Sequence, residues 1–141
     1  MCDENAPIST FEFQSNKTHL LRLINTSGEG TQVFSIDDHV LTVIANDYIP
    51  IEPYEADYVI LGPAQRADVI VKGTGGAKKS FYARSSVGPC DPIFHPHALA
   101  AVYYPGADKT EAPSTQSTIT LDPSFCHNVR SLFSLTLDHI D

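Results

Sequence analysis

The chain has 141 residues, enough for one domain with a buried core but too few for two. Its hydrophobic fraction of 42% and charged fraction of 18% are those of an ordinary globular protein, and the sequence contains no apolar run long enough to predict a membrane span. The net charge of −8 argues against nucleic acid and anionic membrane surfaces as partners, because both repel an acidic protein.

Features that report on the cellular compartment point in two directions. The first ten residues are polar and acidic, without the basic start and apolar run of a signal peptide. Asn16 and Asn25 nevertheless begin Asn-x-Ser/Thr tripeptides, which are glycosylation acceptors only in a secretory protein. Three cysteines leave one over if two pair, and an odd cysteine can have a partner outside the chain. These signs favour a piece of a larger protein.

Short apolar stretches bounded by turn residues predict β-strands along the whole chain. No segment has a sustained apolar stripe of helical period, so we expect an all-β fold, either a β-sandwich or a Greek-key barrel. The expected strands cover residues 18–24, 33–36, 40–44, 48–51, 58–61, 68–71, 80–84, 98–104 and 132–137.

Composition divides the chain into four parts. Residues 1–9 form a polar N-terminal lead, and residues 10–105 contain the predicted domain. Residues 106–131 begin with a stretch rich in Pro, Thr, Ser, Asp and Glu, which indicates a linker. Residues 132–141 contain an apolar alternating stretch that would begin a following domain.

Two linked stretches carry a family resemblance. The first joins LRLIN (residues 21–25) to FSIDDH (34–39) and LTVIA (41–45), and the second is VILGPAQRADVIV (59–71). In this order and spacing they resemble the second plastocyanin-like (cupredoxin) domain of fungal laccases and related multicopper oxidases. The resemblance covers about residues 10–105.

The resemblance implies a cupredoxin-like Greek-key fold within a secreted parent enzyme of three domains. Such an enzyme takes electrons one at a time from a phenol or a metal ion and reduces dioxygen to water. The resemblance also implies that copper is bound by other domains and that the partners of this chain are the flanking cupredoxin domains. Ala64 and Ala67 depart from the family, which often has a glycine and an aromatic residue there. These departures bear on packing and not on the fold.

No copper site is expected among the histidines and cysteines of this chain. His95 and His97 are the pair best suited to a shared metal, because side chains two apart on a strand lie on one face. Pro96 breaks strand hydrogen bonding between them, and a loop is the favoured interpretation. Cys126-His127 lacks the second histidine of the family's His-Cys-His relay.

Glu29 is the candidate substrate-binding residue. It lies in a predicted loop between two strands, and the resemblance places it where laccases carry an acidic residue that contacts the phenolic substrate. A carboxylate there would accept the proton of the phenol, because a phenol radical cation is strongly acidic. The alternative is an exposed turn glutamate without this role. No residue of the chain is expected to be catalytic on its own.

The resemblance also implies a disulfide between Cys90 and Cys126 that ties the linker back to the domain. In the chain-entropy model such a bridge contributes about 4 kcal/mol. The alternative is a pair of free thiols. Cys2 would then be left for a neighbouring domain.

Two functions stay open for the isolated chain. The first is a copper-free domain that spaces its neighbours in a laccase-like oxidase and forms one wall of the substrate pocket. The second is a stand-alone β-sandwich that serves binding or scaffolding and has no redox role. The strand at 132–137 and Cys2 favour the first, and Met1 and the absence of a signal peptide favour the second.

Overall fold

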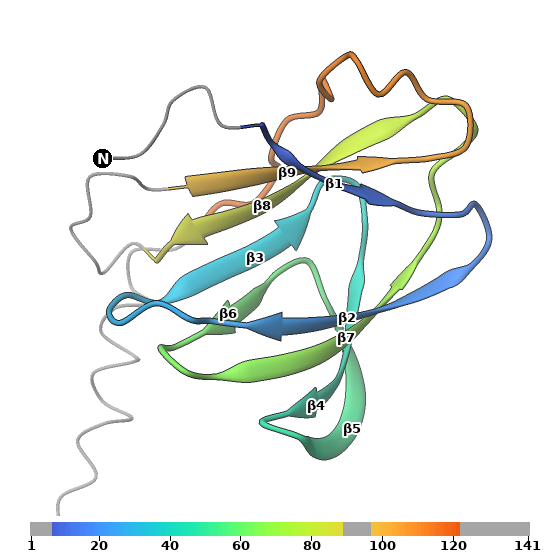
Figure 1. Cartoon of the computed structure of the whole chain (residues 1–141). Helices are drawn as coiled ribbons and strands as arrows, with labels where there is room; N and C mark the ends of the chain where they lie inside the picture. The colour runs from blue at the N-terminus through green and yellow to red at the C-terminus, as the bar shows by residue number, and fades with distance from the viewer. Residues whose placement is uncertain (1–6, 89–96, 122–141) are drawn as a thin grey trace, which may run out of the picture.

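A computed structural model describes residues 7–88 and 97–121, and these residues form two β-sheets that pack face to face (Figure 1). The prediction of an all-β fold is confirmed. None of the described segments is a helix that could cross a membrane. The strands are β1 (Ser9–Glu12), β2 (Thr18–Ile24), β3 (Gln32–Ile36), β4 (Leu41–Asn46), β5 (Ile49–Ala56), β6 (Val59–Leu61), β7 (Arg66–Lys72), β8 (Ser80–Val87) and β9 (His97–Tyr103).

The chain alternates between the sheets almost at every connection. One sheet has five strands in the order β1-β9-β8-β3-β6, and the other has four in the order β2-β7-β4-β5. Only the β4–β5 and β8–β9 connections join neighbours within one sheet. Strands distant in the sequence therefore pair, as in a Greek-key sandwich.

The core follows from residue alternation in the central strands. In β4 and β7 every second side chain is buried, as expected for strands with one face toward a core. The most deeply buried side chains come from both sheets, so the two inner faces share one apolar layer. These side chains are Leu41, Val43, Val69, Val71 and Val102.

A tight hairpin connects β4 to β5. Asp47 and Tyr48 both have positive φ angles, of 45° and 69°, which is the backbone of a type I′ turn. Asp47 Oδ1 accepts hydrogen bonds from the backbone N–H of Arg66 at 3.0 Å and from its Nε at 3.2 Å. The Arg66 guanidinium also lies 4.5 Å from the centre of the Tyr48 ring. These contacts tie the hairpin to β7.

Sequence reasoning missed β1. Its residues fall in and just after the predicted polar lead, and all four are exposed, so no apolar alternation marks the strand. It forms by pairing in parallel with β9, from Ser9 opposite Ala100 to Glu12 opposite Tyr103. The predicted strand at 132–137 lies outside the described residues.

The segment that follows β9 has no strand from residue 104 to 121, but it lies against the five-stranded sheet. Thr115 provides its main attachment, since the Thr115 hydroxyl accepts from the backbone N–H of Tyr82 at 3.1 Å and donates to the Asp37 carboxylate at 2.6 Å. The Tyr103 hydroxyl donates to the carbonyl of Glu111 at 3.0 Å. The first part of the predicted linker is thus held on the sheet.

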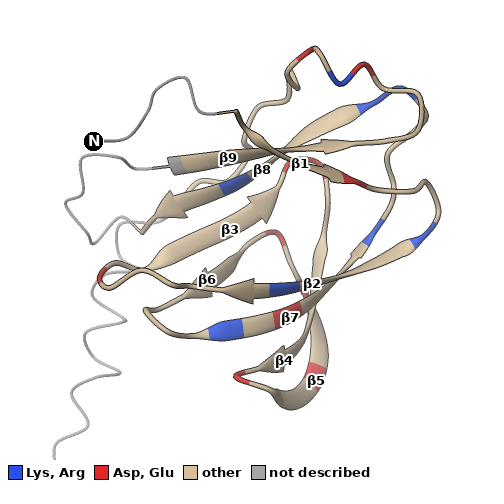
Figure 2. Cartoon of the chain, viewed as in Figure 1, with Lys and Arg blue, Asp and Glu red and all other residues tan. Residues whose placement is uncertain are grey.

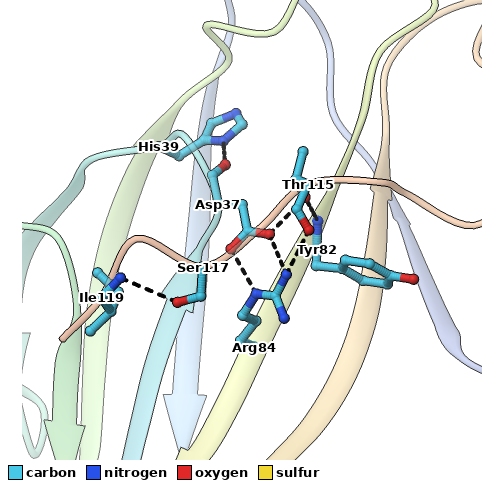
Figure 3. A network of polar contacts seen from close by, with 7 residues as sticks. All are labelled: Asp37, His39, Tyr82, Arg84, Thr115, Ser117 and Ile119. Atoms are coloured by element: carbon cyan, nitrogen blue, oxygen red, sulfur yellow. Dashed lines mark hydrogen bonds and ion pairs between the residues drawn. The ribbon is translucent and has the colours of Figure 1, made fainter. Parts of the chain in front are cut away.

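Asp37 and Arg84 form the ion pair at the centre of this attachment (Figure 3). The Arg84 guanidinium donates to both carboxylate oxygens of Asp37, at 2.8 and 2.7 Å, and also to the carbonyl of Thr115 at 2.9 Å. The Asp37 side chain is only 2% exposed. The hydrogen bond to Asp37 raises the pKa of Arg84 above its usual value, although burial acts the other way.

We expect Arg84→Ala to lower the free energy of unfolding by about 3–5 kcal/mol, because it leaves a buried carboxylate without its counter-charge. Urea unfolding followed by circular dichroism measures this loss. Arg22→Ala is the matched control, since Arg22 is exposed on β2 and its removal should change stability by no more than about 0.5 kcal/mol. Equal stabilities of the two variants would contradict the prediction.

Candidate functional site

The loop between β2 and β3, residues 25–31, is organised around one buried amide. Asn25 is 4% exposed, and its Nδ2 donates to the carbonyls of Gly30 at 3.1 Å and Leu61 at 2.9 Å. Its Oδ1 accepts from the backbone N–H of Ser27 at 3.0 Å and from the Ser27 hydroxyl at 2.6 Å. The Asn25 side chain therefore uses its full hydrogen-bonding capacity to fix the loop and to join it to β6.

Glu29 is exposed in this loop, as the sequence predicts. It lies between Gly28 and Gly30, and Gly30 has a φ of +92°, a conformation that other residues rarely adopt. The loop carries no other charged residue, and Figure 2 shows its single acidic segment. The fixed backbone thus presents one carboxylate to the surroundings.

An open pocket of about 430 Å³ lies beside the loop. Apolar side chains from three strands meet polar groups there, and the Ser85 hydroxyl donates to Gln32 Oε1 at 2.8 Å. Glu29 itself does not line the pocket. A mixed surface of this kind can hold the apolar face of a small ring and leave its polar substituents at the rim. The lining residues are Leu23, Ile24, Asn25, Thr26, Ser27, Gln32, Phe34, Leu61 and Ser85.

The imidazole of His39 is committed to the fold. It is 6% exposed, and its Nδ1 lies 2.7 Å from the Asp37 carbonyl, so Nδ1 carries the proton. Its Nε2 then accepts a hydrogen bond from the Tyr104 hydroxyl at 2.7 Å. Burial raises the pKa of Tyr104, which keeps this donor protonated. The His39 ring also packs edge-on against Phe81 at 4.8 Å.

The described residues do not fit a copper site. The backbone N–H of Gln14 donates to His19 Nε2 at 3.1 Å, and the His19 ring stacks on Phe13 at 4.1 Å. Within residues 7–88 and 97–121, no three His, Cys, Asp or Glu side chains lie close enough to hold a metal ion. Copper binding also requires a free nitrogen lone pair, which both imidazoles use in hydrogen bonds.

Several predicted residues fall outside the described part of the chain. These include Cys90, Cys126 and His95, so the disulfide stays a prediction, as does the absence of a metal at His95 and His97. The backbone of His97 begins β9, opposite Ser86 of β8.

Sequence reasoning missed the structural role of Asn25, which it treated as part of the family resemblance and as a glycosylation candidate. The signal was present, because Asn with Ser two residues later is a pattern in which the asparagine side chain bonds the following backbone. The hydrogen bonds from Asn25 to Gly30 and Leu61 could not be predicted from the sequence. Leu61 is distant in the sequence and comes near Asn25 only because β6 pairs with β3.

Comparisons with known proteins agree with this architecture. The family model described as multicopper oxidase matches residues 2–107. Laccase-3 of Botryotinia fuckeliana is 32% identical over 111 residues, which are 78% of this chain and 24% of that protein. The crystal structure of a laccase from Botrytis aclada superposes with a TM-score of 0.68 at 33% identity, over 83% of this chain and 21% of that one. Fet3p, a multicopper oxidase that functions in iron import, gives a TM-score of 0.70 at 26% identity and covers 85% and 23%.

The two-sheet sandwich superposes on a laccase, and the family model matches most of the chain. Together these findings define a cupredoxin fold of the laccase type. The chain therefore belongs to the multicopper oxidase family. It spans less than a quarter of the length of the relatives named above.

We expect Asn25→Ala to lower the free energy of unfolding by about 2–3 kcal/mol, because the carbonyls of Gly30 and Leu61 lose their donor in a buried setting. Thr26→Ala changes the exposed neighbour and serves as the control. Chemical denaturation of both variants gives the comparison. An Asn25→Ala protein as stable as the control would show that the Asn25 hydrogen bonds do not hold the loop.

Proposed function

We propose that this chain is the middle, copper-free domain of a laccase-like oxidase and forms one wall of its reducing-substrate pocket. The observation that carries the proposal is the loop clamped by Asn25, which presents Glu29 on a fixed backbone beside an open pocket. Binding residues are often found on loops that a rigid scaffold holds in one conformation, as the Asn25 hydrogen bonds do here.

The chemistry assigned to Glu29 is proton acceptance. A phenol that gives up one electron becomes a strong acid, and its hydroxyl proton must go to a base within hydrogen-bond reach. The Glu29 carboxylate is exposed, and it belongs to the loop whose first residues, Asn25, Thr26 and Ser27, line the pocket. In this proposal the electron passes to a neighbouring domain of the parent enzyme, where the family's copper is bound.

Contact with flanking domains accounts for an apolar cleft on the surface of this chain. A cleft of about 490 Å³ opens between the two sheets on the side of β1 and β2, and mostly apolar side chains line it. Phe11 and Leu20 stand at this cleft with about half of their surface exposed. Large exposed apolar side chains around a groove are typical of surfaces that another domain covers. In this proposal the parent enzyme is secreted.

We expect Glu29→Gln in the intact parent oxidase to lower kcat/KM for a phenol by at least about tenfold. This loss corresponds to the free energy that one charge-assisted hydrogen bond contributes in the transition state. Oxidation of ferrocyanide, a donor that releases no proton, should be unchanged. Glu52→Gln, at an exposed position on β5, is the matched control. Equal losses with both donors, or none with phenol, would remove Glu29 from the substrate site.

The copper-free assignment has a separate test. Calorimetric titration of the purified chain with Cu²⁺ should show no tight binding at one ion per chain, and the chain should not oxidise phenols with dioxygen. The family's ligand sets need imidazole or thiolate groups held together, and no such set is expected in this chain. Stoichiometric copper that survives dialysis would overturn the assignment.

A further inference from the structure

We propose that Asn16 carries an N-linked glycan and that Asn25, which has the same acceptor pattern, does not. The two tripeptides, Asn16-Lys17-Thr18 and Asn25-Thr26-Ser27, stand at opposite ends of β2. The sequence gives no ground for choosing between them. Their surroundings in the folded chain differ sharply.

Asn16 is well placed to carry a large substituent. Its side chain is exposed in the turn between β1 and β2, and its φ of 60° is one that asparagine tolerates better than most residues. The backbone N–H of Asn16 donates to the Gly73 carbonyl at 2.8 Å, so the backbone is anchored while the side chain stays outside. Thr18, the hydroxyl residue that completes the acceptor tripeptide, is also exposed.

Asn25 has the opposite environment. The nitrogen that would bear the sugar is the Nδ2 that donates to Gly30 and Leu61, and the residue is 4% exposed. A glycan would replace one of the two N–H hydrogens and break one of these bonds. It would also place a sugar ring where Leu61 and the loop backbone pack. Glycosylation at Asn25 is therefore incompatible with the folded loop.

The modification is a group transfer with a defined balance. A bond forms between Nδ2 of Asn16 and the anomeric carbon of an oligosaccharide linked to a lipid diphosphate. The bond between that carbon and the diphosphate oxygen breaks, and the lipid diphosphate leaves. The amide nitrogen gives up one proton, which goes to the released lipid diphosphate. No oxidant or reductant takes part.

The position of Asn16 also keeps the glycan away from the Glu29 loop. Seven residues of β2 separate the two ends, which corresponds to roughly 20 Å along an extended strand. Figure 1 shows the β1–β2 connection and the β2–β3 loop on opposite sides of the sandwich. A glycan at Asn16 leaves the open pocket accessible, and the modification rests on the proposed function only in requiring that the chain be secreted.

The test is expression of the chain behind a signal sequence in a eukaryotic secretory host, with intact mass measured before and after peptide N-glycosidase F. We expect one glycan, lost in Asn16→Gln and in Thr18→Ala. Ser27→Ala removes the second acceptor pattern but keeps Asn25, and it should leave the glycan in place. Peptide N-glycosidase F converts a glycosylated asparagine to aspartate when it removes the glycan. Peptide mapping should therefore find Asp at position 16.

Two results would overturn the proposal. One is a secreted, folded chain whose glycan maps to position 25. The other is a secreted chain without any glycan. Folding is checked independently with the bacterial Asn16→Gln protein, which should keep the circular dichroism spectrum of the bacterial wild type, because the exposed side chain has no part in the core. Its urea midpoint should fall only slightly, since glutamine tolerates the φ of 60° less well than asparagine.

Discussion

Apolar packing between the inner faces of the two sheets is the interaction on which the remaining structure depends. Leu41 and Val43 from β4 and Val69 and Val71 from β7 meet Val102 of the five-stranded sheet, and all are almost fully buried. The chain changes sheet at nearly every connection, so this layer joins segments from distant parts of the sequence. The loops keep their positions because the strands that carry them cannot move without opening this core.

Buried polar groups determine the conformations of loops and connecting segments, which the apolar layer alone does not fix. Asp37 and Arg84 hold the segment after β9 on the outside of the sandwich through Thr115. Asn25 performs the same task for the β2–β3 loop. Hydrogen bonds are directional, and an unpaired buried partner is costly, so each group selects one loop conformation among those that the core would permit.

Strand β2 takes part in several features of the structure at once. Leu21 and Leu23 pack against the core layer, and together with Leu20 they also line the apolar cleft between the sheets. One end leads into the Glu29 loop, and the other begins at the turn that holds Asn16. Leu23 also lines the open pocket beside the β2–β3 loop, so core packing, the cleft and the pocket share part of this strand.

The sequence by itself determined the all-β class, most strand positions, the family resemblance and the exposed position of Glu29, because alternation and turn residues are local signals. It could not show β1, whose exposed residues have no pattern of their own and pair with β9 only after folding. Nor could it separate Asn16 from Asn25, since the two acceptor patterns are alike. Only the tertiary structure brings Leu61 to the Asn25 amide and leaves Asn16 outside, because burial depends on contacts between segments far apart in the chain.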